Sequence, residues 1–200
     1  MLEVEGLRRP GLLDSGPFTL ASGSCLALRG ASGAGKSLLL RALVDLDPNE
    51  GRVSLGGRER RSMPAAAWRR LLAYLPAESG WWASDVASHM HDRAAAQALL
   101  PAVKLPPEAL DWQVPRLSTG ERQRLALVRA LIQKPEILLL DEPTAALDPE
   151  AEAAVEILFT GFLAAGKSLI LVTHNAAQAE RLASTRLTIA KGRLLQEASA

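Results

Sequence analysis

The sequence predicts an α/β fold built on a mostly parallel β-sheet. Short, wholly apolar segments, which are typical of buried strands, alternate along the chain with segments whose apolar residues recur at helical spacing. The clearest apolar segments are Cys25–Leu28, Ile137–Leu140 and Leu169–Val172. A glycine-rich loop, Gly30–Ser37, follows the first of them and leads into a helix predicted over Leu38–Val44. Strands separated by helices in this way form βαβ units, in which the strands lie parallel.

The first third of the chain is expected to add an antiparallel β segment to this sheet. Short strands with alternating polarity are predicted at Leu2–Val4 and Phe18–Leu20, and turns separate them from the apolar strand that follows. The elements expected after the first helix are a strand over Arg52–Leu55, a short helix through Trp68 and a strand over Leu71–Leu75.

A small helical insert is predicted after the strand over Leu71–Leu75, and further strands and helices follow it. From Pro76 to Pro115 the sequence holds many alanines and several prolines without a strand pattern, which predicts a small, mostly helical insert. Later, Asp148 and Pro149 supply an N-cap and a first-turn proline for a helix that reaches about Ala164. The other elements expected are helices over Glu121–Gln133 and Ala176–Leu182, and strands near Leu187–Ile189 and Arg193–Leu195.

The composition is that of an ordinary globular protein. Of 200 residues, 48% are hydrophobic and 22% are charged, and the net charge of +1 gives no electrostatic reason to expect nucleic acid or an anionic membrane as a partner. The single cysteine, Cys25, excludes an intrachain disulfide framework and is expected to be a small core residue in a reducing compartment. Neither a membrane span nor a signal peptide is expected, so a membrane role would come through a partner.

The glycine-rich loop Gly30–Ser37 fits the pattern G-x-x-x-x-G-K-[ST] of a phosphate-binding P-loop. Backbone N–H groups of such a loop and the N-terminus of the helix after it favour negative charge. Lys36 is expected to reach the β- and γ-phosphates and Ser37 to hold Mg²⁺. An ordinary glycine- and serine-rich turn is the alternative, which the flanking strand and helix disfavour. The predicted nucleotide contacts are Gly30, Ala31, Ser32, Gly33, Ala34, Gly35, Lys36, Ser37 and Leu38.

Polar residues follow two of the apolar strands. Asp141 and Glu142 come directly after Ile137–Leu140, and two acids at the end of a buried strand are costly unless they meet a cation or a proton-transfer task. We expect Asp141 in the shell of Mg²⁺ and Glu142 next to the attacking water. A charged strand end before a proline turn is the alternative. His174 follows Leu169–Val172 and is either a structural histidine or a donor to the γ-phosphate.

A third motif opens the helix predicted over Glu121–Gln133. The segment Leu117–Gln123 contains a capping box, with Ser118 as the N-cap and Glu121 three residues later. The box explains the local structure but does not explain Gly120. Because a capped helix N-terminus is also an anion site, both a structural and a phosphate-binding interpretation stay open.

The order of these motifs resembles that of the nucleotide-binding subunits of ATP-binding cassette (ABC) transporters. The segment Leu-Ser-x-Gly-Glu, here Leu117–Glu121, is what distinguishes this family from other P-loop NTPases, and the resemblance covers about Leu2 to Leu195. It implies a single ABC ATPase domain over residues 1–200. In that domain, residues 1–76 and 117–200 would form a RecA-like core and residues 77–116 a helical subdomain.

The resemblance also implies a head-to-tail dimer with two ATP molecules between the chains. Lys36 and Ser37 of one chain would face Ser118 and Gly120 of the other across one γ-phosphate, and Asp148 would couple the two sites. Glu142 would be the general base, and His174 would sense the γ-phosphate. The chain would hydrolyse ATP with Mg²⁺ to drive a separate transmembrane permease. It would lie in the cytoplasm at the inner face of the membrane and make no direct contact with nucleic acid.

The sequence departs from the family pattern at several positions. Ala77 stands where the family usually has a glutamine that touches Mg²⁺, and the neighbouring Glu78 could supply a carboxylate to the metal or be a solvated loop acid. The segment Leu7–Leu12 has no aromatic residue to stack on adenine, so either Arg8 or Arg9 stacks on the base or the base is loosely held. Thr119 replaces the usual glycine of the signature motif.

Two further features have no assigned role in the nucleotide site. Trp81 and Trp82 are adjacent, and either one of them is exposed as an anchor for a partner or both pack within the helical insert. His89 and His91 suggest a metal site only weakly, because no further ligands accompany them.

Two other functions stay open beside the transporter ATPase. One is a soluble, non-transport ABC ATPase that acts on a nucleic-acid or protein complex, which the near-neutral charge disfavours. The other is a nucleotide-dependent binding module with weak hydrolysis, which the alanine at position 77 would suit.

Overall fold

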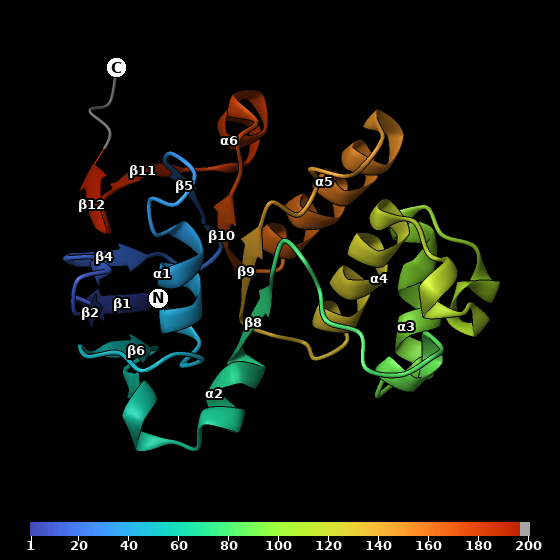
Figure 1. Ribbon diagram of the computed structural model, residues 1–200, viewed down its shortest axis with the longest axis horizontal. Coiled ribbons are helices and arrows are strands. Elements are labelled where there is room, and N and C mark those ends of the chain that lie inside the picture. Colours follow the sequence, from blue (N-terminus) through green and yellow to red (C-terminus); the bar gives the residue numbers. More distant parts are fainter. Residues whose placement is uncertain (197–200) are drawn as a thin grey trace.

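A six-stranded, mostly parallel sheet runs through the centre of the molecule (Figure 1). The computed structural model describes residues 1–196, and the strand order in this sheet is β12-β11-β5-β10-β9-β8. Neighbouring strands run parallel except β12, which pairs antiparallel with β11. The strands are β5 (Cys25–Arg29), β8 (Leu72–Leu75), β9 (Ile137–Asp141), β10 (Ser168–Val172), β11 (Thr185–Ala190) and β12 (Arg193–Gln196). The predicted α/β class is therefore confirmed.

A second, antiparallel sheet lies beside the first and has the order β4-β1-β6-β7. Its strands are β1 (Leu2–Glu5), β4 (Pro17–Leu20), β6 (Val53–Leu55) and β7 (Arg58–Glu59), and a small hairpin joins β2 (Arg8–Arg9) to β3 (Leu13–Asp14). The predicted N-terminal antiparallel segment is confirmed. The strands β2, β3 and β7 were not predicted, because each is only two residues long and lies next to a turn.

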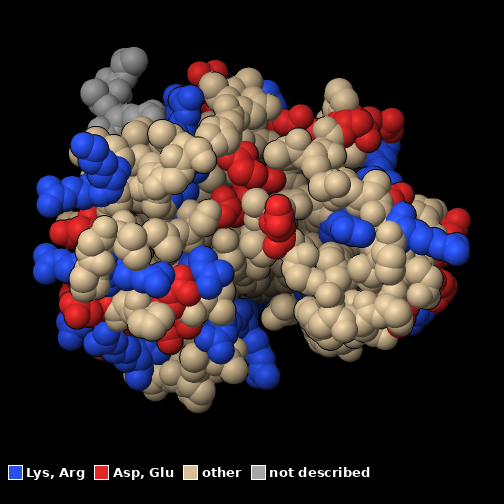
Figure 2. All heavy atoms as spheres, viewed as in Figure 1, with Lys and Arg blue, Asp and Glu red and all other residues tan. Residues whose placement is uncertain are grey.

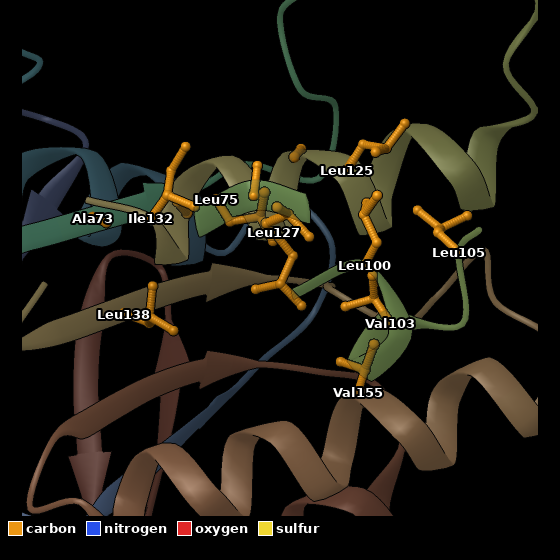
Figure 3. Close-up of a cluster of buried hydrophobic side chains, with 14 of the residues drawn as sticks. Ala73, Leu75, Leu100, Val103, Leu105, Leu125, Leu127, Ile132, Leu138 and Val155 are labelled. Atoms are coloured by element: carbon orange, nitrogen blue, oxygen red, sulfur yellow. The ribbon is translucent and has the colours of Figure 1, made fainter. Parts of the chain in front are cut away.

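Alternate residues of the central strands pack into two different cores. In β9, Leu138 and Leu140 belong to one buried cluster while Ile137 and Leu139 belong to the other. Figure 3 shows the first cluster, in which Leu127 of α4 (Thr119–Leu131) lies between Leu138 and Leu100, and Val155 of α5 (Pro149–Ala164) lies next to Val103. The second cluster lies under α1 and the antiparallel sheet. Because a strand presents successive side chains to opposite faces, this double burial explains why the strands are apolar throughout.

The longer helices start where the capping residues predicted. The Asp148 side chain accepts a hydrogen bond from the Ala151 amide and caps α5, with Pro149 in its first turn. The Ser118 side chain caps α4 in a capping box with Glu121. The helices outside the insert are α1 (Lys36–Leu43), α2 (Ala65–Leu71), α4 (Thr119–Leu131), α5 (Pro149–Ala164) and α6 (Ala176–Leu182).

The segment between β8 and α4 forms a compact group of short helical turns, at the right of Figure 1. Only one α-helix forms there, α3 (Arg93–Leu99), and the rest is 3₁₀ structure: η2 (Ala87–His89), η3 (Leu100–Val103), η4 (Pro107–Asp111) and η5 (Val114–Arg116). The prolines at 101, 106, 107 and 115 explain the short turns, because proline cannot donate the backbone hydrogen bond of a helix interior. Leu100 and Val103 are fully buried and anchor this group on the first core cluster.

None of the helices among residues 1–196 is long and apolar enough to cross a membrane.

Candidate nucleotide-binding site

The P-loop sequence lies where β5 passes into α1. The N-cap of α1 is Gly35, with φ of 108°, and neither a side chain nor an acidic residue caps the first turn. The Lys36 ammonium group turns back over the loop and donates to the carbonyl oxygens of Gly30 and Ala31, at 2.8 and 3.0 Å. The uncapped amides of α1 and this ammonium group face the same loop, which is the arrangement of an anion site.

Gly30 shows why this loop needs glycine. Its φ is 152°, and a Cβ at this position would stand 2.3 Å from the Ile189 carbonyl oxygen of β11. Because that neighbour is backbone, no side-chain rotation could relieve the contact. The loop is therefore fixed against the sheet, and its amides are held in place before any ligand binds.

A cavity of about 320 Å³ opens beside the loop. It gathers residues that follow four strands of the sheet, as expected for the carboxyl ends of parallel strands. Its lining consists of Ser32, Gly33, Gly35, Lys36, Ser37, Leu38, Ala77, Asp141, Glu142 and His174. Figure 2 shows acidic side chains gathered near the centre of the molecule, in the region that Figure 1 places between α1 and α5.

Asp141 is held by two hydroxyl groups at the end of β9. The Ser37 hydroxyl donates to Oδ2 of Asp141 at 2.6 Å, and the Tyr74 hydroxyl donates to the same oxygen at 3.3 Å. Burial, and then the charge of Asp141, raise the pKa of Tyr74, so its phenol stays protonated and able to donate. A serine hydroxyl beside a carboxylate is a donor set that suits Mg²⁺, so Ser37 and Asp141 fit the predicted metal.

Glu142 has an unusual backbone conformation, and one of its carboxylate oxygens accepts no hydrogen bond from the described residues. Its φ is 51°, a left-handed conformation that costs a non-glycine residue on the order of 1–3 kcal/mol and that is frequent at functional sites. Among the described residues, its buried Oε1 accepts no hydrogen bond, while Oε2 accepts one from the His174 amide at 3.3 Å. The His174 ring lies beside it, with Nε2 at 3.3 Å from Oε1. A buried carboxylate oxygen without a donor is available to a ligand or a proton.

Two hydrogen-bonded residues beside these acids were not predicted from the sequence. Tyr74 is one, although it precedes the last residue of a strand whose carboxyl end was expected at this edge. Gln123 is the other, and its Nε2 donates to the Glu142 carbonyl oxygen at 3.4 Å from the buried side of α4. Its place within the Leu117–Gln123 motif was the available signal.

The Ser118 and Gly120 positions lie at the start of α4 and do not line the cavity. The Ser118 hydroxyl lies 2.9 Å from Oε2 of Glu121, which also accepts from the Ser118 amide at 2.8 Å. The structure explains Gly120, which the capping box left unexplained. A Cβ there would stand 2.9 Å from the Ala146 carbonyl oxygen, so glycine permits the close approach of α4 to the loop that precedes Asp148.

The two departures from the family pattern have different surroundings. Ala77 lines the cavity, whereas Glu78 is exposed, does not line it, and makes no side-chain hydrogen bond or ion pair with another described residue. Arg8 and Arg9, the candidates for stacking on a base, each form an ion pair, and their role toward a base stays a prediction. Arg8 lies 3.5 Å from Asp14, and Arg9 lies 3.3 Å from Asp47.

The tryptophan pair surrounds His89. Trp82 is 73% exposed and Trp81 is partly buried against the first core cluster, so the expectation that one is exposed holds and joint burial is wrong. The His89 Nε2 accepts from the Trp82 and Ala83 amides, and Nδ1 lies 2.9 Å from the Asp85 carbonyl oxygen. Within residues 1–196, no group of three or more His, Cys, Asp or Glu side chains is placed to hold a metal.

Comparison with known proteins decides the family. The family model described as "ABC transporter" matches residues 13–145, which is more than half of the chain. The chain belongs to the ABC transporter family. Within that family it is an ATP-binding subunit, and it is an ABC transporter ATPase. The glycine-rich loop, the acids after β9 and His174 are therefore found together in an ABC fold.

Individual relatives are similar in sequence to nearly the whole chain. The aliphatic sulfonates import ATP-binding protein SsuB 1 of Nocardia farcinica is 35% identical over 96% of this chain and 79% of that protein. SsuB 2 of Paracoccus denitrificans is 38% identical over 94% of this chain and 77% of that protein. The Fe(3+) ions import ATP-binding protein FbpC of Pseudomonas fluorescens is 34% identical, and the chain spans 54% of its length.

Solved structures share the fold. An ATP-binding subunit of an ABC transporter superposes with a TM-score of 0.84 at 26% identity, covering 98% of this chain and 90% of that one. A bacterial Atm1-family ABC exporter with ATP bound superposes with a TM-score of 0.83 at 26% identity, but the chain covers 38% of it. The chain thus shares its fold with most of the ATP-binding subunit and with a smaller part of the exporter.

Proposed function

We propose that this chain hydrolyses Mg²⁺-ATP at a site completed by a second copy of itself, and that it drives a separate membrane permease. The observation that carries the proposal is the single cavity that joins the P-loop to Asp141, Glu142 and His174. Its residues supply phosphate binding, a metal-binding pair and a carboxylate without a donor on one oxygen. In-line attack of water on a γ-phosphate needs these parts.

Each residue of the cavity has a proposed role. The Lys36 ammonium group exchanges its loop carbonyls for β- and γ-phosphate oxygens, and the α1 amides bind the same phosphates. Ser37 and Asp141 hold Mg²⁺, which when bound neutralises charge on the phosphate oxygens. Glu142 accepts the proton of the attacking water. His174 keeps the Glu142 side chain in place and donates to the γ-phosphate.

The second copy supplies the other wall of the site. Ser118 and Gly120 do not line the cavity of their own chain, although Ser118 is exposed. In the proposed head-to-tail dimer, they face the γ-phosphate bound by the P-loop of the partner. Glu78, which is also exposed, approaches the metal only if its loop shifts by one residue. If the Glu78→Ala chain keeps the Mg²⁺ dependence of the normal chain, that role of Glu78 is excluded.

The permease is proposed to dock on the face that carries Trp82. A groove of about 210 Å³ lies between the end of β8 and α4, and Arg69 and Arg129 belong to its lining. The Arg129 guanidinium lies 4.8 and 5.1 Å from the ring centres of Trp81 and Trp82. Residues 77–116 would then form the helical subdomain beside this groove, and the chain would lie at the inner face of the membrane. Trp82→Ala should lower co-purification with a membrane protein and keep the basal ATPase rate.

The test of hydrolysis compares the two glutamates that flank β9. Glu142→Gln should lower the rate of phosphate release by about 100-fold or more, since general-base catalysis contributes about 10²–10⁴-fold, while ATP still binds. Glu136→Gln is the matched control. Glu136 stands just before the opposite end of β9 and pairs with Lys167 at 2.8 Å, so this variant should keep the normal rate.

Other results would favour the alternatives. Equal rates in the two variants would contradict the role of Glu142. ATP binding without measurable hydrolysis by the unchanged chain would favour a nucleotide-dependent binding module. Partners recovered only from soluble complexes would favour a non-transport ABC ATPase.

A further inference from the structure

A buried glutamine lies behind the catalytic cavity without lining it. Gln178 of α6 is fully buried, and its Nε2 donates to the Thr144 hydroxyl at 2.9 Å and to Oε1 of Glu156 at 3.1 Å. Its backbone amide donates to Oδ1 of Asn175, the N-cap of α6, at 3.1 Å. The side chain therefore joins α6 to Thr144 and to α5, while the backbone amide of the same residue binds the N-cap of α6.

The direction of the Gln178 amide is set by its neighbours. Oε1 of Glu152 lies 3.5 Å from Nε2, and Oε1 of Glu156 lies closer, so the NH₂ group must face these acids. The opposite atom, Oε1 of Gln178, is buried and has no hydrogen-bond partner among the described residues. Burying an acceptor without a hydrogen bond lowers the stability of the fold, and an apolar side chain at this position would avoid that loss. Stability alone therefore does not account for a glutamine here.

The segments that Gln178 joins are those that carry the two cavity residues. Thr144 stands two positions after Glu142, and Asn175 directly follows His174. The Asn175 side chain also donates to Oε1 of Glu152 at 3.0 Å. The loop after β9 and the loop after β10 are therefore held against each other and against α5 from behind the cavity.

We propose that Gln178 is a positioning residue that holds Glu142 and His174 in register for hydrolysis. The proposal rests on the proposed function. The His174 Nε2 lies 3.3 Å from Oε1 of Glu142, and the two residues stand in the loops after β10 and β9. The Gln178 side chain binds Thr144 in one turn, and its backbone amide binds the Asn175 side chain in the other, so this residue links the two turns. Because Asp148 caps α5 and Glu152 and Glu156 lie on α5, a shift of that helix reaches the pair through this amide.

The test compares Gln178 with Arg181, which both contact Glu156, to distinguish an effect on catalysis from an effect on the stability of the fold. Gln178→Met keeps the length of the side chain and removes both donors, and it should lower kcat for ATP by about tenfold, since small misplacements of catalytic groups have such effects. KM for ATP should stay within about twofold, because the P-loop is untouched. Arg181→Met is the control. It removes the Glu156 ion pair of 2.7 Å from the same helix but not the link to Thr144, and it should leave kcat within about twofold.

Thr144 supplies a second, independent pair of variants. Thr144→Val removes the hydroxyl and should reproduce the loss of kcat, whereas Thr144→Ser keeps the hydroxyl and should restore it. Combining Thr144→Val with Gln178→Met should add little further loss, because both remove one link. This pair also serves if Gln178→Met fails to fold.

Three results would overturn the proposal while leaving the proposed function intact. The first is an unchanged kcat in Gln178→Met, and the second is an equal loss of kcat in Arg181→Met. The third is a Thr144→Ser chain with a kcat as low as that of Thr144→Val. Each kcat is measured per folded molecule, in a chain that hydrolyses ATP. Absence of hydrolysis by the unchanged chain would contradict the proposed function and this inference together.

Discussion

The N-termini of α1 and α4 are the two proposed phosphate sites, and they differ in what satisfies their backbone amides. At α1 no side chain caps the helix, no acid lies in the first turn, and Lys36 stands over the loop. At α4 the Ser118 hydroxyl accepts from the Glu121 amide at 3.2 Å, and the Glu121 carboxylate adds a negative charge. One terminus is open to an anion within the single chain, while the other is already satisfied.

This difference supports the proposal that one chain carries only half of a site. The α1 terminus lies in the cavity with Asp141 and Glu142, and the α4 terminus lies outside that cavity. A capping box stabilises the exposed end of α4 before any partner arrives. The phosphate of a second chain would have to compete with Glu121 for the Ser118 hydroxyl. We therefore expect α1 to control nucleotide affinity and α4 to contribute mainly to folding in the isolated chain.

Removing the charge at α1 should have the largest effect. Lys36→Ala should weaken ATP binding by about 10- to 100-fold, because a hydrogen bond from a charged donor contributes about 1.5–3 kcal/mol. Equilibrium binding of a labelled nucleotide measures the change. The exposed Lys134, which lies outside the cavity, provides the control substitution Lys134→Ala with unchanged affinity. Equal affinities in Lys36→Ala and the unchanged chain would remove the distinction between the two termini.

Crowding the α4 terminus should have the next largest effect. In Gly120→Ala the new Cβ would stand 2.9 Å from the Ala146 carbonyl oxygen, so the backbone must shift. Overpacking costs about 1–3 kcal/mol, and the better helix propensity of alanine offsets up to about 1 kcal/mol. Thermal unfolding should show a Tm lower by a few degrees, at about 2–4 °C per kcal/mol for a chain of this size. A raised Tm would mean that the contact is not tight in solution.

Removing the cap of α4 should have a smaller effect on stability. Ser118→Ala should cost about 1 kcal/mol of unfolding free energy and leave ATP affinity of the isolated chain unchanged. The neighbouring Thr119, which starts the helix and does not cap it, supplies the control Thr119→Ala. If Ser118→Ala instead weakened ATP binding as much as Lys36→Ala, the open and capped termini would not be separate in function.

The N-cap of α5 is an aspartate, so its contribution to stability depends on pH, unlike that of the serine that caps α4. The backbone hydrogen bond from Ala151 lowers the pKa of Asp148. The Asp148 carboxylate therefore contributes its full stabilisation at pH values above its unfolded-state pKa, near 3.8. The stabilisation is lost as the pH falls through the lower pKa of the folded state. Asp148→Asn keeps a good cap and should flatten the acid side of the stability curve slightly. An unchanged curve would exclude Asp148 as a source of that dependence.

Local patterns predicted most of the fold and the residues of the cavity. Apolar strands buried on both faces, the caps at Ser118 and Asp148, and the glycine loop are each determined by residues close in sequence. Contacts between distant segments could not be predicted in this way. The Tyr74 to Asp141 hydrogen bond and the Gln178 to Thr144 hydrogen bond depend on which strands are neighbours.

The two loop residues after β8, Ala77 and Glu78, differ in where they lie. Ala77 lines the cavity, as its position in the sequence suggested, whereas Glu78 is exposed to solvent. Adjacent side chains in a loop need not point in the same direction. Its role as a metal ligand stays a prediction. The division into residues 1–76 and 117–200 against 77–116 also stays a prediction, and residues 197–200 of it lie outside the described residues.

The most direct test of the half-site account is the mass of the Glu142→Gln chain in solution with ATP. Light scattering should give twice the mass of a single chain with ATP and the mass of one chain with ADP. Adding Ser118→Arg should abolish the doubling while each P-loop still binds ATP. A single-chain mass at saturating ATP, or a doubling that Ser118→Arg leaves unchanged, would contradict the claim that the α4 terminus of one chain completes the α1 site of another.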